Sequence, residues 1–78
     1  MHTAYIYRAA VDTRNFSFEA FARNEAEARI CLVNALHAHA DQYDLDTSFV
    51  DSVIPEVEVQ KIKLNSGYRD HTILIREG

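Results

Sequence analysis

The chain has 78 residues, 47% of them hydrophobic and 26% charged, with two glycines, one proline and a formal net charge of −4. This size and composition fit a single folded domain over residues 1–78 and exclude a disordered or low-complexity chain. The single cysteine excludes an internal disulfide, and no apolar run approaches the ~20 residues that span a bilayer, so we expect a cytoplasmic protein without a membrane partner.

The beginning of the chain predicts an antiparallel hairpin. Residues 3–11, TAYIYRAAV, are rich in Tyr, Ile and Val, as strands are. The polar DTRN that follows contains residue types that favour turns. In residues 15–22, NFSFEAFA, polar and apolar residues alternate, which places Phe16 and Phe18 on one face of a second strand. We therefore expect the two strands to pair and both phenylalanines to anchor the core.

A long helix is predicted over residues 25–43, which contain no Gly or Pro and are rich in Ala and Leu. Asn24 is a favourable N-cap, and Glu27 completes a capping box. The apolar positions of this helix fall on two stripes. The first, which we expect to face the sheet, contains Ala28, Leu32, Ala35, Leu36, His39 and Tyr43. The second, on the far side, contains Ala26, Ile30, Val33, His37 and Ala40. Because a helix on a sheet buries one face, the second stripe predicts a further cover, from residues 47–54 or from a partner chain.

A short second helix is predicted within residues 45–56, LDTSFVDSVIPE. Thr47 or Ser48 can act as its N-cap, apolar residues follow at i, i+3 and i+4, and Pro55 ends it.

Two more strands follow. In residues 56–64, EVEVQKIKL, the apolar positions change from odd to even numbers, which a bulge near residues 60–61 or a strand with two apolar faces would explain. Residues 65–70 indicate a loop or turn, and residues 71–77, HTILIRE, indicate a final strand. The predicted fold is therefore a two-layer α+β domain in the order β-β-α-α-β-β. One long helix packs across a four-stranded antiparallel sheet, and a short second helix follows the first.

The segment LHAHADQYDLD, residues 36–46, resembles a metal-binding pattern, since His-x-His beside acids is common in metal sites. In a helix, however, residues i and i+2 are about 200° apart, so His37 and His39 point in nearly opposite directions. His37 can meet Asp41, but two ligands are fewer than the three or four that zinc takes from proteins. We therefore expect no metal, a partly buried His39, and an exposed His37 paired with Asp41.

Catalytic motifs are not evident in the sequence. Cys31 lies in the middle of the predicted helix in an apolar setting, which favours an inert thiol. The two glycines, Gly67 and Gly78, cannot make a phosphate-binding loop. We expect neither an enzyme nor a cofactor.

Charge is distributed unevenly along the chain. Residues 30–60 contain six acidic and no basic side chains, whereas residues 61–78 contain four basic and two acidic ones. Such a block creates a negative field that disfavours direct binding of nucleic acid and favours a protein partner with a basic surface. The alternative is a face that only keeps the protein in solution. The predicted partner-binding residues are the acids Asp41, Asp44, Asp46, Asp51, Glu56 and Glu58, together with Ile30, Val33 and His37 of the second helical stripe.

Two alternative functions stay open. The first is a structural homo-oligomer, such as a homodimer, built on the stripe of Ile30, Val33 and His37 or on a sheet edge. The second is a small nucleic-acid-binding domain in which tyrosines and arginines of the sheet, namely Tyr5, Tyr7, Arg8 and Arg69, stack on bases and hold phosphates.

The opening AYIYRAAV, followed by FSFEAFARNEAEARICL, resembles a pattern of small phage and mobile-element proteins. In that pattern a strand hairpin leads into A-x-[N/S]-x-x-E/A-A at the start of a helix, carried here by Ala22, Asn24, Ala26 and Ala28. In size, acidity and layout, residues 3–36 resemble proteins of the anti-CRISPR type. This resemblance implies a stoichiometric, phage-encoded inhibitor that docks on a nucleoprotein complex in the host cytoplasm, and it implies no particular site residues.

Overall fold

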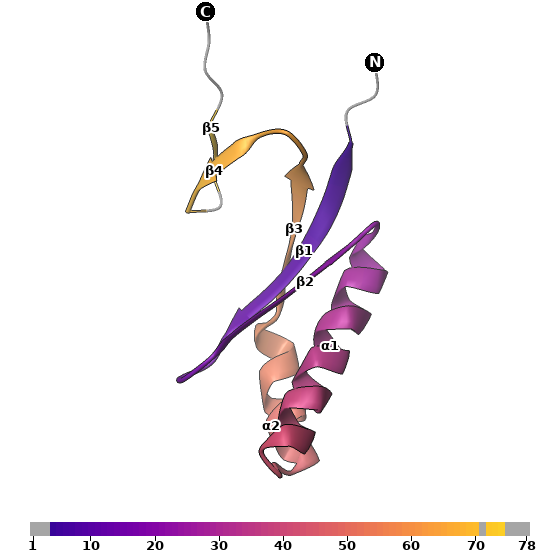
Figure 1. Ribbon diagram of the computed structural model, residues 1–78, viewed down its shortest axis with the longest axis vertical. Coiled ribbons are helices and arrows are strands. Elements are labelled where there is room, and N and C mark those ends of the chain that lie inside the picture. Colours follow the sequence, from indigo (N-terminus) through magenta and orange to yellow (C-terminus); the bar gives the residue numbers. More distant parts are fainter. Residues whose placement is uncertain (1–3, 71, 75–78) are drawn as a thin grey trace, which may run out of the picture.

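The computed structural model describes residues 4–70 and 72–74 of the chain (Figure 1). The protein is elongated, with extents of 52 × 23 × 19 Å. Its elements in chain order are β1 (Tyr5–Asp12), β2 (Ser17–Ala22), α1 (Glu25–Gln42), α2 (Thr47–Val53), a 3₁₀ turn (Ile54–Glu56), β3 (Glu58–Lys63), β4 (Gly67–Arg69) and β5 (Thr72–Leu74). The prediction of an α+β fold with one long and one short helix is confirmed.

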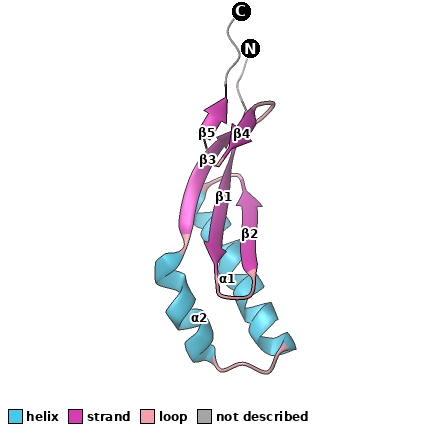
Figure 2. Ribbon diagram, turned by 90° about the vertical axis from the view of Figure 1, so that its left-hand side faces the viewer, coloured by secondary structure: helices cyan, strands magenta, loops and turns pink. Residues whose placement is uncertain are grey.

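The sheet is built around β1, which pairs antiparallel with β2 on one side and with β3 on the other. Side chains alternate between the two faces of each strand, so Ala9 and Val11 of β1 and Phe18 and Ala20 of β2 face the helices. Figure 2, which looks onto the sheet, shows α1 behind β1 and β2. The helices therefore cover one face of the sheet, and no helix of the described residues lies on the opposite face.

The prediction of a four-stranded sheet is wrong. β4 and β5 pair with each other in a separate two-stranded hairpin, from Gly67↔Leu74 to Arg69↔Thr72. β4 lies where the sequence predicts a loop, and Asp70, with a left-handed φ of 48°, turns the chain back directly after it. Of the predicted final strand, residues 71 and 75–77 lie outside the described part of the chain.

Of the two explanations offered for the change of apolar phase in residues 56–64, the bulge near residues 60–61 is not the one that the structure shows. β1 and β3 pair in an unbroken register from Tyr5↔Lys63 to Ala10↔Glu58. In a regular strand Val59 and Ile62 must lie on opposite faces, and both are half-buried. The second explanation, a strand with two apolar faces, is therefore the correct one.

The core is a small cluster between the sheet and the two helices. Its buried members are Ala9, Val11, Ala28, Leu32, Leu36, Ala40, Val50 and Val53. The four members from α1 are spaced by four residues, and four residues turn a helix by about 400°, so the buried line drifts by about 40° at each step. This drift carries the buried line around α1 by about 120° from Ala28 to Ala40, and α1 contacts both the sheet and α2.

The drift corrects the prediction of two separate apolar stripes on α1. Ala40, assigned to the far stripe, is buried, and Val33 is half-buried against the core. Ile30 and His37 remain exposed, Ile30 by 59%. The far stripe is therefore not one continuous apolar face, because the fold of the chain itself covers part of it.

The ends of the helices are closed by local hydrogen bonds. At the start of α1, the Asn24 side chain accepts a hydrogen bond of 2.8 Å from the Glu27 N–H, as predicted. At its end, Leu45 N–H donates to Ala40 C=O at 2.7 Å and Asp44, at φ 56°, adopts the left-handed conformation, which together make a Schellman motif. α2 is capped by Asp46, which accepts from the Ser48 N–H, and not by Thr47 or Ser48 as predicted.

The left-handed conformation of Asp44 predicts that a glycine at this position stabilises the fold. Asp44→Gly should raise the free energy of unfolding by about 0.5–1 kcal/mol, because glycine adopts a positive φ without steric cost. Asp41→Gly is the matched control: it removes the same charge inside α1 and should lower the free energy of unfolding by about 1 kcal/mol. Urea denaturation of both variants measures these free energies. If both substitutions raise the free energy of unfolding, or both lower it, the prediction is contradicted.

Candidate functional site

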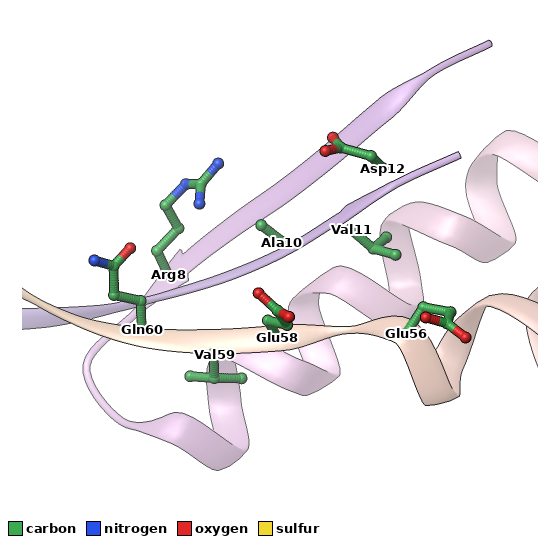
Figure 3. A pocket seen from close by; sticks show the side chains of 8 residues that line it. All are labelled: Arg8, Ala10, Val11, Asp12, Glu56, Glu58, Val59 and Gln60. Carbon is green, nitrogen blue, oxygen red and sulfur yellow. The ribbon is translucent and has the colours of Figure 1, made fainter. Parts of the chain in front are cut away.

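Three surfaces of the described chain combine a hollow with exposed functional groups. The first lies on the face of the sheet that the helices leave uncovered, where β1 and β3 form a hollow of about 690 Å³. Figure 3 shows Arg8 and Gln60 on this face and Val59 on the opposite, helix-covered side. Arg8 forms a salt bridge of 2.9 Å with Glu19 of β2. Asp12, Glu56 and Glu58 also line this hollow, so it offers carboxylates to a basic group.

The second surface is an aromatic groove at the helical end of the molecule, with a volume of about 430 Å³. The β1–β2 turn, the last turn of α1 and α2 form its walls. The groove is lined by Thr13, Arg14, Asn15, Phe16, His39, Tyr43, Leu45, Phe49, Ser52 and Val53. Three of these residues expose large apolar surface: Phe16 by 45%, Tyr43 by 52% and Leu45 by 42%.

His39 lies at the centre of the aromatic rings. Its ring centroid is 4.8 Å from that of Phe16, 5.0 Å from Phe18 and 4.7 Å from Tyr43. Phe49 of α2 approaches it to 5.5 Å. The prediction of a partly buried His39 is confirmed, and its neighbours are rings from three different elements, which hold one another at tilted and edge-to-face angles that favour aromatic contact.

Local hydrogen bonds fix the position of Phe16 at the wall of the groove. The N–H and the hydroxyl of Thr13 both donate to the Phe16 carbonyl at 2.8 Å. The Phe16 N–H in turn donates to the Thr13 hydroxyl oxygen at 3.3 Å. The predicted turn DTRN therefore has a definite geometry, and Phe16 is held just before the first residue of β2.

The third surface is basic and lies at the end of the sheet near β4. Tyr5, Lys61, Lys63 and Tyr68 line a hollow of about 330 Å³, together with Gln60 and Ile73. The Nζ atom of Lys61 lies 4.3 Å from the centroid of the Tyr5 ring, a cation–π contact. The hydroxyl of Tyr68 accepts a hydrogen bond of 2.7 Å from the Lys63 backbone N–H.

The residues named for a nucleic-acid site do not form one surface. Tyr5 and Tyr7 lie on the face of β1 that carries the buried Ala9, whereas Arg8 lies on the opposite face and is paired with Glu19. Tyr7 is half-buried against the core. Only Tyr5 reaches the basic hollow.

The predicted acidic partner site is divided into two groups. Asp41, Asp44 and Asp46 lie close together in sequence where α1 turns into α2, and all three are exposed. Glu56 and Glu58 belong to the hollow on the uncovered sheet face. The remaining acid, Asp51, is exposed on α2, about 200° around the helix from Phe49 of the groove.

The pairing of His37 with Asp41 that the sequence predicts is wrong. Both side chains are exposed, and the described residues show neither a hydrogen bond nor a salt bridge between them. An exposed pair at i, i+4 gains only a few tenths of a kcal/mol, which is little against the entropy of ordering two side chains.

Among the same described residues, no group of three His, Cys, Asp or Glu side chains is placed to hold a metal ion.

The aromatic groove is the feature that the sequence prediction missed. Phe16 was expected in the core, and Tyr43 in the core-facing stripe, yet about half of each side chain is exposed. One feature of the sequence pointed to an exposed apolar surface here. Leu45 is a large apolar residue between two aspartates, and it does not fit the apolar spacing of either predicted helix. His39 and Tyr43 share the predicted core-facing stripe, but their partners from the hairpin and from α2 can only be seen in the fold.

None of the described helices has both the length and the apolar character to cross a membrane. Comparisons with protein-family models, with curated protein sequences and with solved structures found no significant match to this chain.

The different burial of Phe16 and Phe18 predicts different effects on stability. Phe18→Ala should lower the free energy of unfolding by about 2–3 kcal/mol, because this half-buried ring packs on the core. Phe16→Ala should lower it by about 1 kcal/mol or less, since much of this ring stays in water. Urea denaturation gives both values. A loss at Phe16 as large as that at Phe18 would mean that the groove wall belongs to the core.

Proposed function

We propose that this protein is a non-enzymatic binding module that attaches to a basic surface of a partner protein through its helical end. The observation that carries the proposal is the position of Asp41, Asp44 and Asp46 beside the aromatic groove. Among the described residues, none of these three carboxylates belongs to a salt bridge. Their field is therefore directed into solvent, where a basic surface can meet it.

The electrostatics of α1 support this proposal. The C-terminal end of a helix carries a partial negative charge, so carboxylates there are unfavourable by a few tenths of a kcal/mol each. Asp41 lies in the last turn of α1 and Asp44 just beyond it. Asp46 differs, because it caps α2. Among the described residues, no salt bridge of the Asp41 side chain offsets this cost, so its carboxylate remains available to a partner.

The resemblance to proteins of the anti-CRISPR type suggests the kind of partner. A host complex that processes nucleic acid has a basic surface for phosphates, and exposed carboxylates can occupy such a surface. In this proposal a phage-encoded chain works in the host cytoplasm by steric and electrostatic blocking. It acts in a stoichiometric complex and performs no chemistry.

A charge-neutralised variant tests the acidic surface. A partner is first captured from a host-cell lysate and purified, and its affinity is then measured by calorimetry at several salt concentrations. The variant Asp41→Asn/Asp44→Asn/Asp46→Asn should bind about tenfold more weakly at low salt, with a flatter salt dependence, because three interface charges are lost. Asparagine tolerates the left-handed conformation and caps helices as well as aspartate does, so the fold is retained.

The matched control removes three carboxylates from the uncovered sheet face, by Asp12→Asn, Glu56→Gln and Glu58→Gln. This variant should keep the wild-type affinity and salt dependence. If it weakens binding while the helical-end variant does not, the partner binds the sheet face instead. Unchanged binding by both variants would refute the proposal.

A second candidate function is a homodimer that pairs through β2. The observation that favours it is that β2 is an edge strand of the described sheet and carries Phe21, which is 52% exposed. A free strand edge with an apolar side chain is a template for pairing with another strand.

Sedimentation separates the two dimer surfaces that remain. A β2 dimer should show a molecular mass that rises with concentration, and Phe21→Lys should abolish the rise, because a lysine on an edge strand opposes pairing. Ile30→Lys, which alters the most exposed apolar residue of α1, should leave the dimer intact. The reverse result would place the dimer on the helix, and a monomer at all concentrations would remove this candidate.

A further inference from the structure

In the aromatic groove several exposed apolar side chains meet around one hollow, whereas other exposed apolar residues stand alone. Ile30 and Phe21 each line none of the three hollows, whereas Phe16 of the hairpin and Tyr43 and Leu45 at the end of α1 line the same one. Apolar residues scattered singly on a surface are ordinary, but a contiguous group around a hollow marks a binding site.

The groove is formed before any partner arrives. The Thr13 hydrogen bonds fix Phe16, the ring of His39 contacts those of Phe16 and Tyr43, and the Schellman motif fixes the chain at Leu45. A preformed site avoids the entropy that would otherwise be lost when loops and side chains are ordered on binding.

The charges around the groove select the occupant. Asp44 and Asp46 flank Leu45 directly in the chain, and Asp41 lies one turn before it. Of the residues that line the groove, Arg14 is the only Lys or Arg. An anionic lipid surface or a nucleic-acid backbone would be repelled at this rim. A protein segment that carries Lys or Arg beside an apolar side chain would satisfy both the carboxylates and the rings.

We propose that the aromatic groove receives a single apolar side chain, such as Phe or Leu, from a partner segment whose neighbouring residues are Lys or Arg. The apolar side chain enters between Phe16, Tyr43 and Leu45, and the flanking cations meet Asp44 and Asp46. This inference rests on the proposed function, because it names the element of the basic partner that docks. It adds that the groove determines the dissociation rate, whereas the carboxylates determine the association rate and its salt dependence.

Three synthetic peptides of equal length test the inference by NMR titration of the ¹⁵N-labelled full chain. The first has a central Phe flanked by Lys and Arg, the second replaces the Phe by Ser, and the third keeps the Phe but replaces the basic residues by Glu. The first should shift the amide signals of Phe16, Tyr43 and Leu45. The second should bind at least about tenfold more weakly, as expected for the loss of one buried aromatic side chain. The third should not bind measurably.

Variants of the protein locate the peptide. Leu45→Ser and Tyr43→Ser should each weaken binding of the first peptide several-fold. Phe21→Ser and Ile30→Ser are matched controls, since they remove equally exposed apolar side chains elsewhere and should not change the affinity. Thermal unfolding of all four variants shows whether each is folded at the titration temperature, and Leu45→Met, which keeps an apolar side chain, should retain binding.

The outcomes separate this inference from the proposed function. If the Phe and Ser peptides bind equally while the Glu peptide does not, the groove inference is overturned and the acidic surface stands. If the Glu peptide binds as tightly as the basic one, the basic partner is overturned, and the flanking cations with it. Amide shifts confined to β2 or to the uncovered sheet face, or equal losses in the control variants, would also overturn the groove. Sedimentation that shows self-association lost in Leu45→Ser would assign the groove to a second copy of the chain and overturn the peptide-like occupant.

Discussion

The fold depends on the way in which the buried line of α1 winds around the helix. Ala28, Leu32, Leu36 and Ala40 follow one another at intervals of four residues, and each interval advances the line by about 40°. All four belong to the core cluster, and α1 contacts both the sheet and α2. A heptad-like spacing would have kept the line on one side of the helix. The position of α2, and with it one wall of the aromatic groove, follows from this spacing.

The packing also separates charge along the long axis of the molecule. In Figure 1 the C-terminal end of α1 and α2 lie at one end, and β4 and β5 lie at the other. The aspartates between the helices therefore gather at one end, while Lys61 and Lys63 lie near the opposite end beside Tyr5. The net charge of −4 is the sum over the whole chain and does not describe the local charge at either end. Such polarity orients the molecule in the field of a charged partner before contact, because charges separated by more than a Debye length of about 10 Å act independently.

Sequence patterns predicted those parts of the fold that depend on neighbours in the chain. The hairpin and α1 with its cap at Asn24 are local, and they are confirmed. The end of α2 at Pro55 was predicted less exactly, because α2 ends at Val53 and Pro55 lies within the 3₁₀ turn that follows. The number of strands in the sheet was not predictable in this way, because it depends on whether the last strand pairs with β3 or with its neighbour β4. The chain turns back after β4 through Asp70, whose left-handed conformation is one that aspartate adopts only occasionally. The acidic block was visible in the sequence, but its division between the helical end and the sheet face follows from where β3 begins, which is a property of the whole fold.

The groove could not be predicted for a further physical reason, which is the size of the core. Among the described residues, the fully buried side chains are aliphatic, and the largest are Leu32, Leu36 and Val50. A sheet of three strands with two helices does not enclose enough space for the rings of Phe16, Phe18 and Phe49, so these rings lie at the border of the core, where they contact one another and water. Aromatic residues in this position contribute to stability through one face and leave the other face free. A small domain that cannot bury its aromatic residues thus leaves them partly exposed, and some of the side chains that line its groove also contact its core.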